Sequence, residues 1–79
     1  MQITVIRNRF GHLHIFKGSQ DGKLTNLSSN VLLNGKESDF YLQTDADINE
    51  IKEHMTQKQR QELNNGYTVV MNDPGYINK

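Results

Sequence analysis

The chain has 79 residues, which is enough for one domain around one core but not for two. It carries nine basic and nine acidic residues, for a formal net charge of zero, and it has no cysteine, which excludes disulfides and thiolate metal sites. Because small secreted domains usually need disulfides, we expect a cytoplasmic protein. No apolar stretch approaches the roughly 20 residues of a membrane-spanning helix, so we expect no membrane partner.

The composition is rich in amides and poor in apolar side chains. Hydrophobic residues make up 34% of the chain, and it contains nine Asn and six Gln. We therefore expect a thin core, with one helical layer on one sheet, which a homodimer would extend. A short chain of this composition is also typical of an accessory protein from a phage, a plasmid or a similar element.

The charge is divided unevenly along the chain. Residues 1–36 carry five basic residues and one acidic residue, for a net charge of +4, and residues 37–79 carry a net charge of −4. Such asymmetry indicates either a binding pole or two halves that complement each other in the fold.

The first half of the chain is predicted to form strands. Residues 3–8 alternate and are rich in β-branched side chains, residues 9–11 indicate a turn, and residues 12–17 alternate strictly. The pair Asp21-Gly22 favours a tight hairpin, followed by a weaker strand over residues 23–27.

A second hairpin is predicted further along. After a break at residues 28–30, Val31–Leu33 is a strand, and Asn34-Gly35 is the strongest hairpin signal in the chain. Residues 36–42 are the expected return strand, with Phe40 and Leu42 on one face and Tyr41 on the other.

The sequence pattern predicts a helix from Thr44 on. The Thr44 hydroxyl suits a helix N-cap, and Asp45 and Asp47 follow where the helix dipole favours acidic side chains. Ile48, Ile51 and Met55 recur at helical spacing, and residues 56–59 form a second capping-box pattern. The helix is therefore either kinked near Met55 or broken there into two. It stops at residues 64–66, and residues 67–71 form a last strand before a turn at residues 72–75.

This order, β-β-β-β-α-β, predicts a single α+β domain over residues 1–79. We expect an antiparallel meander of about four to five strands, with the helical segment packed on one face.

The other face of the sheet is the first candidate site. If Ile3, Val5, Leu13 and Ile15 face the helix, alternation sends the intervening side chains outward. The predicted partner-binding residues of this hairpin are Arg7, Arg9, Phe10, His12, His14, Phe16 and Lys17. The alternatives are a different register, or a further strand or the C-terminal tail covering this face.

Metal chemistry is weakly indicated. His12 and His14 share a face of the predicted strand, but a zinc site normally needs three or four protein ligands. Residues 45–56 open like a calcium loop, yet Glu50 stands where Gly is required and Thr56 where Glu is required. We predict no metal and no cofactor.

Enzymatic motifs are also missing. The sequence holds no nucleophile elbow and no glycine-rich phosphate loop, and its carboxylates cluster in one hydrophilic stretch. We therefore expect no enzymatic activity.

The remaining hypotheses concern binding. The main one is a small protein that regulates or inhibits a protein partner, through the hairpin or through an acidic surface that includes Asp39, Asp47 and Glu50. The alternative is a weak nucleic-acid-binding module, in which the aromatic residues of the Arg7–Lys17 hairpin stack on bases and its basic residues contact phosphates.

Overall fold

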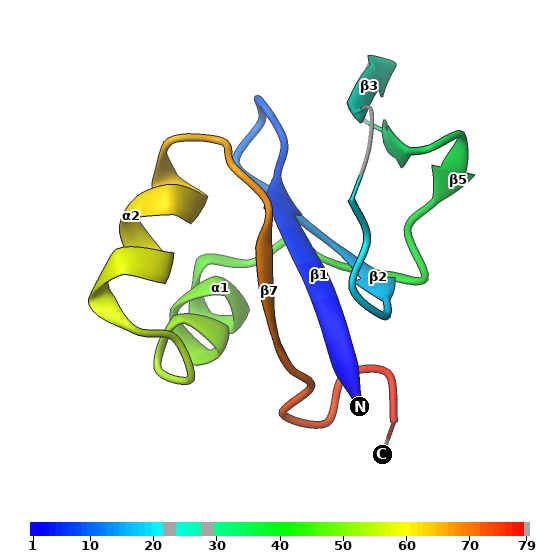
Figure 1. The fold of residues 1–79 in the computed structure, drawn as a ribbon. Helices are drawn as coiled ribbons and strands as arrows, with labels where there is room; N and C mark the ends of the chain where they lie inside the picture. The colour runs from blue at the N-terminus through cyan, green and yellow to red at the C-terminus, as the bar shows by residue number, and fades with distance from the viewer. Residues whose placement is uncertain (22–23, 28–29, 79) are drawn as a thin grey trace.

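The computed structural model describes residues 1–21, 24–27 and 30–78. These residues form three layers: two helices, a four-stranded antiparallel sheet and a smaller three-stranded sheet (Figure 1). The large sheet has the order β6-β2-β1-β7 and contains β1 (Gln2–Arg7), β2 (Leu13–Lys17), β6 (Phe40–Leu42) and β7 (Val69–Asn72). The small sheet contains β3 (Leu24–Leu27), β4 (Asn30–Leu33) and β5 (Lys36–Glu37), and the helices are α1 (Asp45–Lys52) and α2 (Gln57–Asn64). The predicted α+β class is confirmed.

The main core lies between the large sheet and the helices. Antiparallel pairing of Val5 with Ile15 places the inward side chains of β1 and β2 on one face, as the alternation predicts. Each fully buried aliphatic side chain stabilises the fold by about 1.5–3 kcal/mol. The buried residues of this core are Ile3, Val5, Leu13, Ile15, Leu42, Ile48, Ile51, Met55, Leu63, Val69 and Met71.

The opposite face of the large sheet is covered by the small sheet, as Figure 1 shows at the right of the molecule. Ile6 and Phe16 pack there with Val31 and Leu33 of β4 in a second buried cluster. Phe16 is completely buried and His14 is only 4% exposed. The expectation that these two side chains lie on an open face is therefore wrong, because a further strand covers it.

The expected return strand over residues 36–42 is divided between the two sheets. Asn34 and Gly35 both have positive φ, 54° and 78°, and form the predicted tight turn into β5. The chain then crosses to the large sheet at Asp39, whose N–H donates to the carbonyl of Ile15 (2.9 Å). The Asp39 carboxylate in turn accepts the N–H of Lys17 (2.8 Å). The strands of the expected meander therefore occupy two sheets instead of one.

The helical segment consists of two helices, which resolves the alternative at Met55. Thr44 caps α1 by accepting the N–H of Asp47 (3.2 Å). A capping box then starts α2: Thr56 accepts the N–H of Gln59 (3.2 Å), and the Gln59 side chain accepts the N–H of Thr56 (2.9 Å). Gly66, with φ of 83°, follows the end of α2. The Asp21-Gly22 turn predicted from the sequence falls partly outside the described residues.

Candidate functional site

The loop that joins β1 to β2, residues 8–12, is here called the hairpin tip. Asn8 organises it, because its Oδ1 accepts the backbone N–H groups of Phe10 (2.9 Å) and His12 (3.0 Å). Its backbone also pairs with His12, since Asn8 N–H donates to the His12 carbonyl (2.9 Å). Gly11 has φ of 87°, and a Cβ there would lie 3.2 Å from Nη2 of Arg7, so the turn requires glycine. Hydrogen bonds within the loop therefore hold the backbone of the hairpin tip in one conformation.

Two side chains project from this loop. The guanidinium carbon of Arg9 lies 5.1 Å from the centre of the Phe10 ring, which is a cation–π distance. The Phe10 side chain is 56% exposed. An exposed aromatic ring paired with an arginine thus sits on a loop whose backbone is held by internal hydrogen bonds.

Arg7 ties the hairpin tip to the C-terminal end of α2. Its Nε donates to the carbonyl of Gly11 (3.2 Å) and its Nη1 to Oδ1 of Asn64 (3.4 Å). Lys52 donates to the same oxygen (2.9 Å), so two cations share one amide acceptor. An open hollow of about 470 Å³ lies between these segments, lined by Ile6, Arg7, Asn8, Arg9, Gly11, Leu63, Asn64, Asn65 and Gly66.

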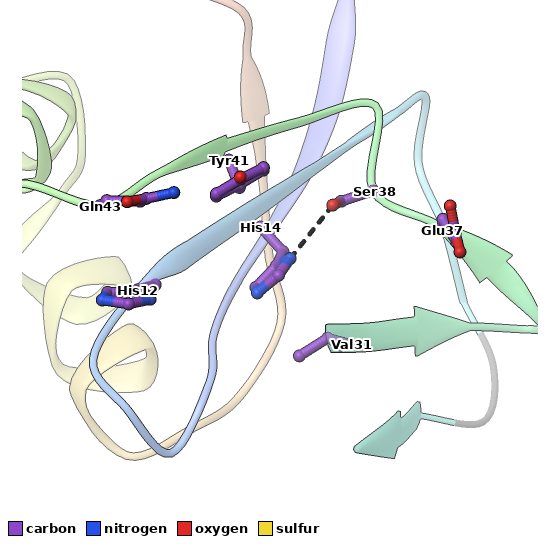
Figure 2. A pocket seen from close by; sticks show the side chains of 7 residues that line it. All are labelled: His12, His14, Val31, Glu37, Ser38, Tyr41 and Gln43. Atoms are coloured by element: carbon purple, nitrogen blue, oxygen red, sulfur yellow. Dashed lines mark hydrogen bonds between the residues drawn. The ribbon is translucent and has the colours of Figure 1, made fainter. Parts of the chain in front are cut away.

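A second hollow, here called the histidine pocket, lies on the other side of His12, between the two sheets. It has a volume of about 300 Å³ and is lined by His12, His14, Val31, Glu37, Ser38, Tyr41 and Gln43. Figure 2 shows these side chains spread along the pocket, with His12 and Gln43 at one end of the view and Glu37 at the other. Tyr41 is 52% exposed, and its ring stacks on His14 with centroids 5.9 Å apart and planes 20° apart.

The hydrogen bonds of His14 determine its tautomer. Oδ1 of Asn8 already accepts two backbone N–H groups, so its Nδ2 must be the atom that faces Nε2 of His14 (3.0 Å) and donates to it. Nε2 is therefore an acceptor, and the ring proton is on Nδ1. That proton is donated to Oγ of Ser38 (3.1 Å), the bond drawn in Figure 2.

This tautomer decides what the Asn8–His14–Ser38 chain can do chemically. The arrangement looks like a nucleophile with its base and orienting group. A general base, however, must present a lone pair to the hydroxyl, and His14 presents a proton to Ser38 instead. In this tautomer His14 accepts no proton from Ser38, and the two hydrogen bonds fix side chains that line the histidine pocket.

The pair His12-x-His14 does not form a metal-ligand set in this structure. Both ring nitrogens of His14 are engaged by Asn8 and Ser38. Within residues 1–21, 24–27 and 30–78, no three His, Asp or Glu side chains are grouped as a metal ion would require.

The structure separates the residues predicted for partner binding. Arg9, Phe10 and His12 lie at the hairpin tip, Arg7 directly precedes it at the end of β1, and His14 lines the adjoining pocket. The other predicted residues lie elsewhere: Phe16 in the core between the sheets, Lys17 and Asp39 at the far end of β2, and Asp47 and Glu50 on α1 in the helical layer.

Two of the three acidic residues predicted for partner binding, Asp39 and Asp47, have side-chain contacts within the protein. Besides the N–H of Lys17, the Asp39 carboxylate accepts the Lys36 ammonium (3.2 Å). Burial alone would raise the pKa of Asp39, but these contacts outweigh it and hold the pKa below its ordinary value. Asp47 accepts from the Thr44 hydroxyl in the first turn of α1.

Sequence reasoning missed Asn8, Ser38, Tyr41 and Gln43. The Asn8–Gly11 segment did carry a signal, because Asn before a Gly-containing turn commonly bonds the backbone two residues on. No local sequence signal marked Tyr41 or Gln43, because they join the pocket only through the pairing of β6 with β2.

Comparisons with known proteins identify no relative: no protein family model, no curated protein and no solved structure matches the chain. In the part of the chain that the structure describes, neither helix has the length and apolar character needed to cross a bilayer.

Proposed function

We propose that this protein is a non-enzymatic binding module that regulates or inhibits a protein partner, and that it contacts the partner through the hairpin tip. One observation carries the proposal. Phe10 is 56% exposed, yet it stands on a loop held by four hydrogen bonds to the backbone and side chain of Asn8.

An aromatic ring in this setting suits an interface anchor. Aromatic residues and Arg are enriched at the centres of protein interfaces, where a few such residues supply most of the binding energy. Because the loop is already ordered, little conformational entropy remains to be lost when it binds. The Arg9–Phe10 pair therefore combines the residue types and the preorganisation of a binding hot spot.

The surroundings of the hairpin tip extend the proposed surface. Gly66 lines the same hollow as Arg9, and the next residue, Tyr67, is 64% exposed. On the other side, His12 leads into the histidine pocket. Concave features thus lie on both sides of the anchor, as expected for a surface that receives protruding side chains of a partner.

The second candidate function is weak nucleic-acid binding by the same hairpin. The Arg9–Phe10 pair also favours it, because Phe10 offers a stacking surface and Arg9 a phosphate contact. Arg7 and Lys52, however, already share the Asn64 oxygen, and Arg9 is the one of these three cations that contacts the Phe10 ring instead. Such a surface supports only salt-sensitive affinity.

The test is a capture experiment with the full chain and a lysate of the cells that make it, with and without nuclease. Three proteins are compared: the wild type, the double variant Arg9→Ala/Phe10→Ala, and the control Lys58→Ala/Val70→Ala. The control also removes one exposed cation and one exposed apolar side chain, but at the N-terminal end of α2 and on β7.

We expect one stoichiometric protein partner that survives nuclease, is retained by the control and is lost with the hairpin-tip variant. Capture that disappears with nuclease would favour the nucleic-acid alternative. Equal capture by the hairpin-tip variant would show that the contact surface lies elsewhere, and absence of any specific partner would contradict the proposal.

A further inference from the structure

We propose that the histidine pocket is a receptor site for a single arginine side chain of the protein partner. This inference rests on the proposed function. Of the hairpin tip, only His12 lines this pocket, so the Arg9–Phe10 pair and the pocket can be tested separately.

The charge of the pocket selects a cation. Among its lining residues the carboxylate of Glu37 is the formally charged group at neutral pH. Lys36, the next residue in the chain, has its ammonium 3.2 Å from Asp39, and Glu37 makes no ion pair within the described residues. An exposed carboxylate without a cationic partner among the described residues therefore stands at one end of the pocket, and it would repel an acidic side chain.

The His14 tautomer contributes to the same selectivity. Because Nε2 accepts from Asn8 and Nδ1 donates to Ser38, the ring is neutral in this arrangement. A protonated His14 would place a positive charge inside the pocket and would oppose a cationic ligand. The hydrogen bond from Asn8 thus keeps the centre of the pocket compatible with a cation.

The shape of the pocket favours arginine over lysine. The Tyr41 ring stacks on His14 and is 52% exposed, and a planar guanidinium stacks on an exposed aromatic face while its N–H groups point outward to acceptors. Val31 supplies an apolar surface for the aliphatic stem, and oxygens of Ser38 and Gln43 add acceptors. An ammonium is a compact charge and lacks the planar fork that these groups would bind.

The size of the pocket limits the occupant to one side chain. Pockets for drug-sized ligands range from about 300 to 1,000 Å³, and the volume here, about 300 Å³, is at the lower bound. A protein partner would therefore insert one residue while its neighbours contact the surrounding surface.

The test uses N-acetyl-arginine methylamide as the probe and the full chain labelled with ¹⁵N. Binding is followed by backbone amide shifts during titration, so that neither the partner nor the Arg9–Phe10 pair is required. The neutral isostere N-acetyl-citrulline methylamide and the lysine analogue are titrated in parallel. The variants are Glu37→Gln, Tyr41→Leu and Tyr41→Phe, with Glu50→Gln on α1 as the control carboxylate.

We expect saturable shifts at the residues of the histidine pocket, with a dissociation constant on the order of millimolar for an isolated side chain. Glu37→Gln and Tyr41→Leu should each weaken binding about tenfold, whereas Tyr41→Phe, which keeps the ring, and Glu50→Gln should bind as the wild type does. The citrulline analogue should not bind, and the lysine analogue should bind more weakly. The amide spectrum of each free variant confirms that its fold is intact.

Three results would overturn the inference: no saturable shifts up to tens of millimolar probe, equal binding of the citrulline analogue, or shifts that Glu50→Gln removes. Any of these could occur while the hairpin tip still captures its partner, and loss of capture by the hairpin-tip variant could occur without pocket binding. Failure of this inference and failure of the proposed function are therefore distinguishable.

Discussion

Gln59 donates a hydrogen bond from its side-chain Nε2 to the carbonyl oxygen of Val70 (3.2 Å). The other end of the same amide accepts the N–H of Thr56 (2.9 Å) and completes the capping box of α2. β7 is an edge strand of the large sheet, and edge carbonyls that face outward can pair with another chain. One side chain thus starts a helix and occupies an acceptor on a sheet edge.

We predict that Gln59→Ala lowers the free energy of unfolding by about 1–2 kcal/mol, because a capping interaction and an edge hydrogen bond are lost together. It should also increase self-association through β7. Urea melts and sedimentation analysis measure the two effects. Gln61→Ala, an exposed glutamine on the same helix, is the control and should change neither. Equal behaviour of the two variants would contradict the assigned role.

Asn8 should determine the tautomer of His14. A long-range ¹H–¹⁵N correlation spectrum of the imidazole should show a neutral ring protonated on Nδ1, because Nε2 accepts from Asn8. Asn8→Asp keeps an acceptor for the loop N–H groups but replaces the donor that faces Nε2 with a carboxylate, so Nε2 should become protonated. A wild-type ring protonated on Nε2 would show that the hydrogen-bond assignment is wrong.

Removing the Asn8 side chain should also destabilise the fold. Asn8→Ala leaves the N–H groups of Phe10 and His12 without their side-chain acceptor, beside a buried histidine. We expect a cost of about 1–3 kcal/mol in chemical denaturation. A cost near zero would mean that water replaces these bonds and that the hairpin tip is not held by Asn8.

Replacing the two phenylalanines of the hairpin should change the stability of the fold by very different amounts. Phe16 is completely buried between the sheets, so Phe16→Ala should cost about 3–5 kcal/mol. Phe10 is exposed, so Phe10→Ala should change stability by no more than about 0.5 kcal/mol. If Phe16→Ala unfolds the chain, the smaller change Phe16→Leu still allows the comparison by thermal melting. Similar losses of stability at the two positions would contradict the burial of Phe16 beneath β4.

Asp73 should make stability depend on pH. Burial alone would raise its pKa, but its carboxylate accepts the N–H groups of Asn78, Gly75, Tyr76 and Ile77, and these bonds hold the pKa below its ordinary value. A folded-state pKa below the unfolded value means that the stabilisation is present above that unfolded value and is lost as the pH falls through the folded pKa.

Asp73→Asn should therefore reduce the loss of stability below about pH 4. The exposed Asp21→Asn serves as the control, because the Asp21 side chain makes no hydrogen bond within the described residues. Denaturant midpoints measured across pH 2.5–7 would show whether Asp73→Asn loses less stability at low pH than the wild type and the control do. An unchanged pH profile in Asp73→Asn would rule out this carboxylate as the source.

Tyr76 carries a buried hydroxyl that has no hydrogen-bond partner among the described residues. Burial, together with the nearby charges of Glu50, Asp47 and Asp73, raises the pKa of this phenol. Tyr76→Phe removes an unsatisfied group and keeps the ring that packs near Phe40. We expect unchanged stability or a gain of up to about 1 kcal/mol in thermal melts. A clear loss would mean that a bound water satisfies the hydroxyl.

Much of the fold could be read from local patterns. The alternation in β1 and β2, the Asn34-Gly35 turn and the Thr56–Gln59 capping box are all observed where the sequence predicts them. Each depends on residues within a few positions of one another, so a single sequence contains the whole signal.

The candidate site could be predicted only in part. Arg9 and Phe10 lie at the hairpin tip because the turn between two strands must be exposed, which local pattern does indicate. Tyr41 reaches His14 only because β6 pairs with β2 across more than twenty residues of chain, and no local pattern encodes that register.

By itself, therefore, the sequence determined the types and order of the elements and the inward-facing residues of the first hairpin. Only the tertiary structure decided that the small sheet covers Ile6 and Phe16, that β6 joins the edge of the large sheet, and that a pocket forms between them. The physical reason is that alternation shows which side chains share a face of a strand. What covers that face depends on long-range packing, which the burial of apolar surface decides for the whole chain at once.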